Sequence, residues 1–219
     1  MISHHAALLA LRAQAVALSV VTTGSATLAA TSTGYSRASG SFVTDGFTVG
    51  MEFTPAGFAV NAVHVITAVT ATLITTADTI AVETASSGRS LTVGLPTLRA
   101  WENVAFTPTA GRWYVEEDYL PGPSAQETLG SRGQVEALPQ YVLKLYGTAG
   151  HGPEALYAAA DALLTAFAPR TGLTLSTGDT LQVRTNPAPF RSQLLAAPQG
   201  GWSVVTVTIP CRVRSANPI

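Results

Sequence analysis

Charged side chains are scarce in this sequence. Asp, Glu, Lys and Arg make up 11% of its 219 residues, against roughly 25% in an average soluble domain. Lys144 is the single lysine, and the net charge is −1. A protein that binds nucleic acid through its phosphates needs many basic side chains, so that class of protein is excluded. A nearly neutral chain also lacks the charge repulsion that keeps copies apart, which favours self-association.

Cysteine and long apolar runs are scarce too. Cys211 is the only cysteine, which excludes a disulfide framework, and its place in an alternating apolar strand predicts a buried thiol. No run of about 18 apolar residues is present, so we expect no transmembrane helix. The Ala- and Leu-rich residues 4–21 are interrupted by Arg12 and Gln14 and follow no basic leader region, which favours an amphipathic helix over a signal peptide.

The sequence also lacks the common catalytic motifs. It contains no G-x-S-x-G, P-loop, H-E-x-x-H, C-x-x-C or G-x-G-x-x-G pattern. The Gly-rich residues 147–152 could hold an anion before a helix, but a strand-to-helix connection explains them better. We therefore expect no catalytic residues, no metal site and no cofactor. A small hydrolase that uses His151 with an acidic cluster, or a carbohydrate-binding module that uses Trp101, Trp113 and Trp202, is a weaker alternative.

The hydrophobic residues, 47% of the chain, suffice for a packed core, and their spacing predicts two helices. The first should run from His4 to about Ser19, capped by Ser3. The second should begin with Pro153 at its first position and end at Pro169. Their expected apolar faces consist of Leu8, Leu11, Ala15 and Leu18 in the first helix, and of Leu156, Tyr157, Ala160, Leu163, Leu164 and Phe167 in the second.

Short strand signals dominate residues 22–93, where Thr, Ser, Gly and Val prevail and charges are few. One expected strand, residues 41–44, leads into an Asp45-Gly46 turn. Short strands with regular turns predict a small all-β barrel or sandwich. We expect this all-β domain, residues 22–93, to be inserted into an α+β domain of residues 1–21 and 94–219. The α+β domain should combine a mixed or antiparallel sheet with two packed helices.

Further strands are predicted within residues 94–219. One spans residues 112–120, and the longest, residues 200–213, contains Pro210, whose missing amide donor predicts a sheet edge or a bulge. Between them, residues 121–137 read as a loop rich in Gly and Pro that is long enough to serve a function.

The charges are unevenly placed along the second domain. Residues 99–143 hold three basic and six acidic side chains, and residues 144–219 hold six basic and three acidic ones. The densest group is Glu116, Glu117 and Asp118, where strand alternation places Glu116 and Asp118 on one face. Paired carboxylates can serve acid–base or cation chemistry, although a solvated strand face is commoner. An acidic zone and a basic zone could also pair head-to-tail between copies and close a ring.

Several segments, taken in order, resemble one family. The residues AWENVAFTP (100–108) and GRWYV (111–115) come first, then YVLKLYG (141–147), and GWSVVTVTI (201–209) comes last. Their order and spacing resemble the tail terminator, or tail completion, proteins of long-tailed bacteriophages. The resemblance covers the first helix and residues 95–213. Compact terminators pass almost directly from the first helix into the sheet, whereas this chain carries about 70 additional residues that resemble small β modules of phage tail proteins.

The resemblance implies a structural viral protein rather than an enzyme. Terminators form a hexameric ring on the last ring of the tail tube, stop its polymerisation and present a surface to the head connector. The implied partners are copies of the chain, the tail tube protein and the head–tail connector, while DNA passes through the lumen without specific binding and no membrane is involved. The implied location is the tail or neck of the virion, assembled in the cytoplasm of the bacterial host. A head-completion protein or a tube subunit is the nearest alternative.

The resemblance also suggests roles for particular residues. An acidic lumen would repel DNA phosphates, which makes Glu116, Glu117 and Asp118 the lumen candidates. The inter-subunit candidates lie in the basic zone and in the expected loop: Arg184, Arg191, Gly130 and Arg132.

Overall fold

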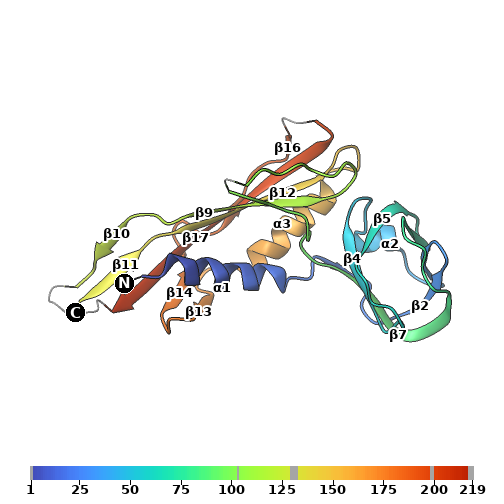
Figure 1. The fold of residues 1–219 in the computed structure, drawn as a ribbon, viewed down its shortest axis with the longest axis horizontal. Helices are drawn as coiled ribbons and strands as arrows, with labels where there is room; N and C mark the ends of the chain where they lie inside the picture. Colours follow the sequence, from blue (N-terminus) through green and yellow to red (C-terminus); the bar gives the residue numbers. More distant parts are fainter. Residues whose placement is uncertain (1, 103, 129–132, 198–199, 217–219) are drawn as a thin grey trace.

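The computed structural model describes residues 2–102, 104–128, 133–197 and 200–216. Helices and strands are mixed, β-structure prevails, and the strands form two sheets that lie at opposite ends of an elongated molecule (Figure 1). Within these residues there are three helices, one more than predicted: α1 (His4–Val16), α2 (Phe42–Asp45) and α3 (Glu154–Ala166).

The helix α1 begins where the sequence predicts. The Ser3 hydroxyl oxygen accepts a hydrogen bond from the Ala6 amide at 3.2 Å, which caps the first turn. The helix ends at Val16, three residues before the predicted end. Its buried side is made of small residues around Leu11, which is fully buried. The small side chains allow α1 to lie close to its neighbours.

The helix α3 follows Pro153, and the negative charge of Glu154 complements the positive end of the helix dipole. Four of the predicted apolar positions are buried: Leu156, Ala160, Leu163 and Phe167. The side-chain amide of Gln14 on α1 donates to the Ala166 carbonyl of α3 at 3.1 Å.

Six strands close into a barrel in the order β7-β2-β3-β6-β5-β4, with β4 paired back to β7. All these pairs are antiparallel. Closure leaves no open sheet edge, and Leu28, Tyr35, Phe53, Ile66 and Ile74 fill the interior. The strands are β2 (Ala26–Thr31), β3 (Gly34–Arg37), β4 (Glu52–Ala56), β5 (His64–Val69), β6 (Leu73–Thr76) and β7 (Glu83–Val93), with β1 (Val21–Thr22) paired to the end of β7.

One predicted strand of this region is wrong. Residues 42–45 form the single-turn helix α2 instead. The Ser41 hydroxyl oxygen accepts from the Thr44 amide at 3.2 Å, and Gly46 ends the turn at φ 99°. A Ser at the start and a Gly just past the end are the signals of a capped helix, and here they outweigh the strand tendency of the residues between them.

The second sheet has ten strands, and its principal order is β10-β11-β17-β12-β9-β8. Its pairs are antiparallel except for β8 with β9. The longest strand, β17, also pairs with β14, β15 and β16 along its other side. The strands are β8 (Arg99–Trp101), β9 (Tyr114–Leu120), β10 (Ser124–Gln126), β11 (Gln134–Ala137), β12 (Gln140–Thr148), β13 (Gly172–Thr174), β14 (Thr180–Val183), β15 (Phe190–Arg191), β16 (Leu195–Ala196) and β17 (Trp202–Ala216).

Two further expectations change in this sheet. Part of the expected loop at residues 121–137 is the hairpin β10–β11, which extends the sheet beyond β12. Pro210 lies within the central strand β17, not at an edge. At Pro210 the strands that pair with β17 change, from β12 to β11 on one side and from β15 to β14 on the other. The missing amide of Pro210 therefore lies between two ladders of hydrogen bonds and interrupts neither.

The barrel is joined to the ten-stranded sheet by partly buried polar contacts. The Trp113 indole and the Thr148 hydroxyl both donate to the Val49 carbonyl, at 3.2 and 3.1 Å. The buried carboxylate of Glu52 pairs with Arg112. It also accepts hydrogen bonds from the backbone amide and the hydroxyl of Thr97, at 2.8 and 2.6 Å. These directional bonds fix the barrel relative to the sheet.

Cys211 is buried, as predicted, and its burial raises the pKa of the thiol to about 12. The neutral thiol therefore prevails at physiological pH. Within the described ranges, no helix combines the length and apolar character needed to cross a membrane.

Candidate functional site

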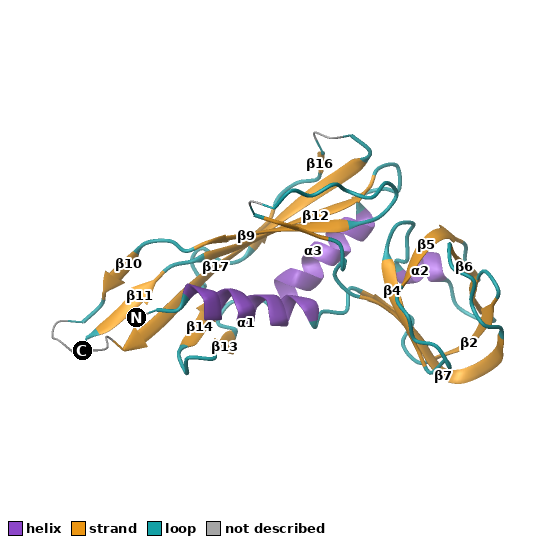
Figure 2. Ribbon diagram, in the orientation of Figure 1, coloured by secondary structure: helices purple, strands orange, loops and turns teal. Residues whose placement is uncertain are grey.

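The ten-stranded sheet has one face covered by α1 and α3 and one without helices (Figures 1 and 2). Along β9, the buried Val115 and Glu117 point to the covered face, whereas Glu116 and Asp118 point to the other. In the antiparallel register, Lys144 of β12 lies opposite Glu116. We call the side opposite the helices the helix-free face.

A carboxylate cluster, formed by Glu116, Asp118 and Lys144, occupies this face. The Lys144 ammonium donates to the Glu116 carboxylate at 2.5 Å and lies 3.1 Å from the nearest Asp118 oxygen. Partial burial lowers the pKa of Lys144, but the hydrogen bonds to the two carboxylates outweigh it and the net shift is upward. With two carboxylates and one ammonium, the cluster keeps a charge of −1.

An aromatic group supports the carboxylate cluster. Tyr114 and Tyr146 stack with their ring centres 4.2 Å apart, and the Tyr146 hydroxyl donates to Glu116 at 2.9 Å. Burial, together with this hydrogen bond, raises the pKa of Tyr146, so it remains a donor. A hollow of about 330 Å³ adjoins the cluster and adds Glu102 to its acidic lining.

Glu117 does not lie with the other two acids. Its side chain is 1% exposed and is held from the covered face. Arg12 of α1 donates to it at 2.9 Å, and Arg99 of β8 pairs with its other oxygen. Arg12 in turn lies 4.1 Å over the Trp101 ring. Within the subunit Glu117 therefore joins α1 to the sheet, and its carboxylate has no exposed surface to offer a lumen.

Of the four inter-subunit candidates, the structure describes Arg184 and Arg191, and it places them in different surroundings. Arg191 of β15 pairs with Asp161 of α3 at 2.8 Å and lies over the Tyr157 ring. Arg184 lies just beyond β14. Gly130 and Arg132 lie outside the described residues.

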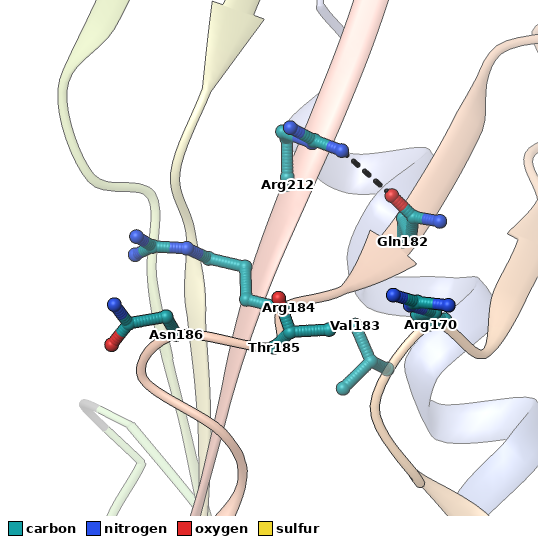
Figure 3. A pocket seen from close by; sticks show the side chains of 7 residues that line it. All are labelled: Arg170, Gln182, Val183, Arg184, Thr185, Asn186 and Arg212. Carbon is teal, nitrogen blue, oxygen red and sulfur yellow. Dashed lines mark hydrogen bonds between the residues drawn. The ribbon is translucent and has the colours of Figure 1, made fainter.

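Sequence reasoning named Arg184 but missed the group of arginines to which it belongs, at the end of the helix-free face. Arg170, Arg184 and Arg212 line a hollow of about 360 Å³, together with Gln182 of β14 (Figure 3). We call it the arginine hollow. The excess of basic residues after position 144 was its only signal, because the three side chains come from separate segments.

Chemically, the face offers carboxylates, hydroxyls and guanidinium groups. Within the described ranges, no group of three or more His, Cys, Asp or Glu side chains is placed to hold a metal ion. The polar groups of this face suit the binding of charged partners and the electrostatic attraction or repulsion of charged molecules that approach it.

Comparison with known proteins gives one family. The sequence profile of the phage tail terminator protein family matches residues 65–214, from β5 of the barrel to near the end of β17. No curated protein matches the chain significantly. Several solved structures match it, and one of them is 21% identical over 55% of this chain and 79% of its own, with a TM-score of 0.41. Because the family profile matches more than half of the sequence, the chain belongs to the phage tail terminator family.

Proposed function

We propose that this chain caps the tail tube of a phage as a hexameric ring, stops tube polymerisation and joins the tail to the head connector. The observation that carries the proposal is the family match over residues 65–214. The low charge of the chain supports it, because copies can approach one another without strong repulsion. The protein then acts as a structural part of the virion neck, assembled in the host cytoplasm from copies of itself, the tube protein and the connector.

The division of the chain belongs to the same proposal. Residues 1–21 and 94–219 would form the terminator domain, with α1 and α3 as its two-helix layer on the sheet. Residues 22–93 would form an inserted domain, which the compact closure of the barrel supports. The barrel lies at one end of the molecule, where it can decorate the ring or contact a neighbouring neck protein (Figure 1).

The helix-free face supports a lumen assignment for Glu116 and Asp118. Both side chains are partly exposed, and the cluster keeps a negative charge despite Lys144. Negative charge repels DNA phosphates, so the DNA can slide without binding. The buried Glu117 is left out of this assignment.

Electron microscopy of the purified full-length protein tests the proposal. We expect six-fold rings about as wide as a tail tube. Mixed with short tail tubes, the rings should cap one end and stop elongation when further tube protein is added. A protein that remains monomeric with and without tubes would contradict the ring, and a protein that co-polymerises along the tube would favour the alternative of a tube subunit.

Charge reversal tests the lumen. In a phage carrying Glu116→Lys and Asp118→Lys, the cluster changes from −1 to +3 in each subunit. We expect virions to assemble but DNA ejection to slow, because the lumen would then attract phosphates. Reversal of two acids away from the face, Asp161→Lys with Asp179→Lys, is the matched control. Equal ejection kinetics in the two mutants would argue against the lumen assignment.

A further inference from the structure

The arginine hollow carries positive charge that the rest of the subunit does not neutralise. Arg212 donates to the Gln182 side chain at 2.8 Å and lies 3.4 Å from Glu136 (Figure 3). Arg170 and Arg184 make no ion pair with any described residue. All three arginines line the one hollow, so an anion bound there would be attracted by each of them.

The backbone under the hollow is held firmly. Arg170 adopts a left-handed conformation with φ 72°, which is uncommon for a residue other than glycine. Its amide donates to the Val183 carbonyl at 3.0 Å, and the Val183 amide donates back to Thr171 at 2.8 Å. The Arg184 amide donates to the Pro210 carbonyl at 2.9 Å. Two charged residues are thus placed beside one hollow before any ligand arrives, which lowers the entropy cost of binding.

The surroundings of the hollow favour carboxylates over nucleic acid. Binding a phosphate backbone requires a long basic track. Here the next arginine along β17, Arg214, is paired with Glu127 and lies 3.5 Å from Glu136. Further along the face come Glu116 and Asp118. A short group of guanidinium forks, too small to follow a phosphate backbone, suits one or two carboxylates, each held by paired hydrogen bonds.

A second copy of the chain fits the hollow poorly. The densest acidic group of the described residues, Glu116 with Asp118, lies on the same helix-free face as the hollow. Register places Lys144 opposite Thr206 and Gln182 opposite Arg212, so the two charged groups are separated by about 20 Å along β17. Neighbours in a ring present different sides to one another, so an acidic and a basic group on one face do not meet.

We propose that the arginine hollow receives the carboxylates of an acidic segment of a different virion protein that stacks against this end of the subunit. This inference rests on the proposed function, which places the chain between the tail tube and the connector. Arg170 and Arg184 supply the unpaired charge, and Arg212 with Gln182 forms the wall. If lumen residues occupy the middle of the same face, the hollow lies nearer one rim, where a stacked protein can reach it.

A defined probe tests the inference on the full-length protein. A fluorescent hexaglutamate peptide should bind at low salt and be released as the salt concentration rises. The double substitution Arg170→Ala with Arg184→Ala should weaken binding at least about tenfold, because two charge-assisted contacts are lost. Arg191→Ala, on the covered face, should leave binding unchanged. A photoreactive group on the peptide should cross-link to residues 182–186.

Other occupants of the hollow, such as nucleic acid, phosphate or a second copy of the chain, would give different results. Equal binding of hexaglutamate to the wild type and the double variant overturns the inference. The inference is also overturned if the same arginines bind duplex DNA or inorganic phosphate more tightly than they bind the peptide. Loss of self-association in the double variant overturns it too, because the hollow would then bind a second copy of the chain. Rings that persist in the double variant while peptide binding is lost support it. If the protein forms no rings but still binds the peptide through these arginines, the proposed function is rejected and the binding site in the hollow is not.

Discussion

Replacing Glu117 with Ala is expected to lower the free energy of unfolding by about 3–5 kcal/mol, the usual cost of removing one partner from a buried ion pair. The substitution leaves Arg99 without its carboxylate partner, with a side chain only 11% exposed. It also frees Arg12, which ties α1 to the sheet. Urea unfolding followed by Trp fluorescence, at one fixed protein concentration, measures the loss.

The neighbouring acid provides the matched control. Glu116 lies one residue away on the same strand, but its side chain is 31% exposed and its partner Lys144 is equally accessible. Glu116→Ala, which removes this accessible ion pair and the acceptor of the Tyr146 hydroxyl, should therefore cost only about 1–2 kcal/mol. Glu117→Gln, which keeps the shape but removes the charge, should fall between the two. A Glu117→Ala protein as stable as the Glu116→Ala protein would show that the buried ion group does not hold α1 in place.

This contrast also shows what the sequence can reveal. Strand alternation alone separates Glu117 from Glu116 and Asp118, and it assigns Glu117 to the face of Trp113 and Val115. Grouping the three acids by their adjacency ignored that separation. The partners of Glu117 could not be read from the sequence, because Arg12 comes from a helix more than a hundred residues away and only the fold brings it near.

Local signals predicted the two long helices well. Ser3, Pro153 and the spacing of apolar residues act within a turn or two, so α1 begins where expected and α3 begins one residue later than expected. The barrel was predicted only as a barrel or a sandwich, because closure depends on the pairing of β4 with β7. The arginine hollow could not be predicted either, because it also depends on strand pairing: the pairing of β14 with β17 places Gln182 beside Arg212.

Replacing Gly34 with Ala is expected to destabilise the barrel by about 3 kcal/mol, at the upper end of overpacking effects. A Cβ atom at this position would lie 1.9 Å from the Ile74 carbonyl oxygen of β6. That atom belongs to the backbone, so β3 and β6 must separate to make room. An alanine in a strand is ordinarily more stabilising than a glycine. The loss of stability expected here is therefore opposite to the effect that intrinsic strand preference alone would give.

Native-state hydrogen exchange measures this effect strand by strand. Amides of β3 and β6 should exchange about a hundredfold faster, the equivalent of roughly 3 kcal/mol. Amides of β12 and β17 should keep their protection if residues 22–93 form a separate domain. Gly172→Ala in β13 is the matched control, because its Cβ would lie 3.9 Å from the nearest atom, an ordinary contact distance. Equal loss of protection in both sheets of the Gly34→Ala protein would mean that the joint at Glu52 and Trp113 makes them one cooperative unit, which would contradict the proposed insertion.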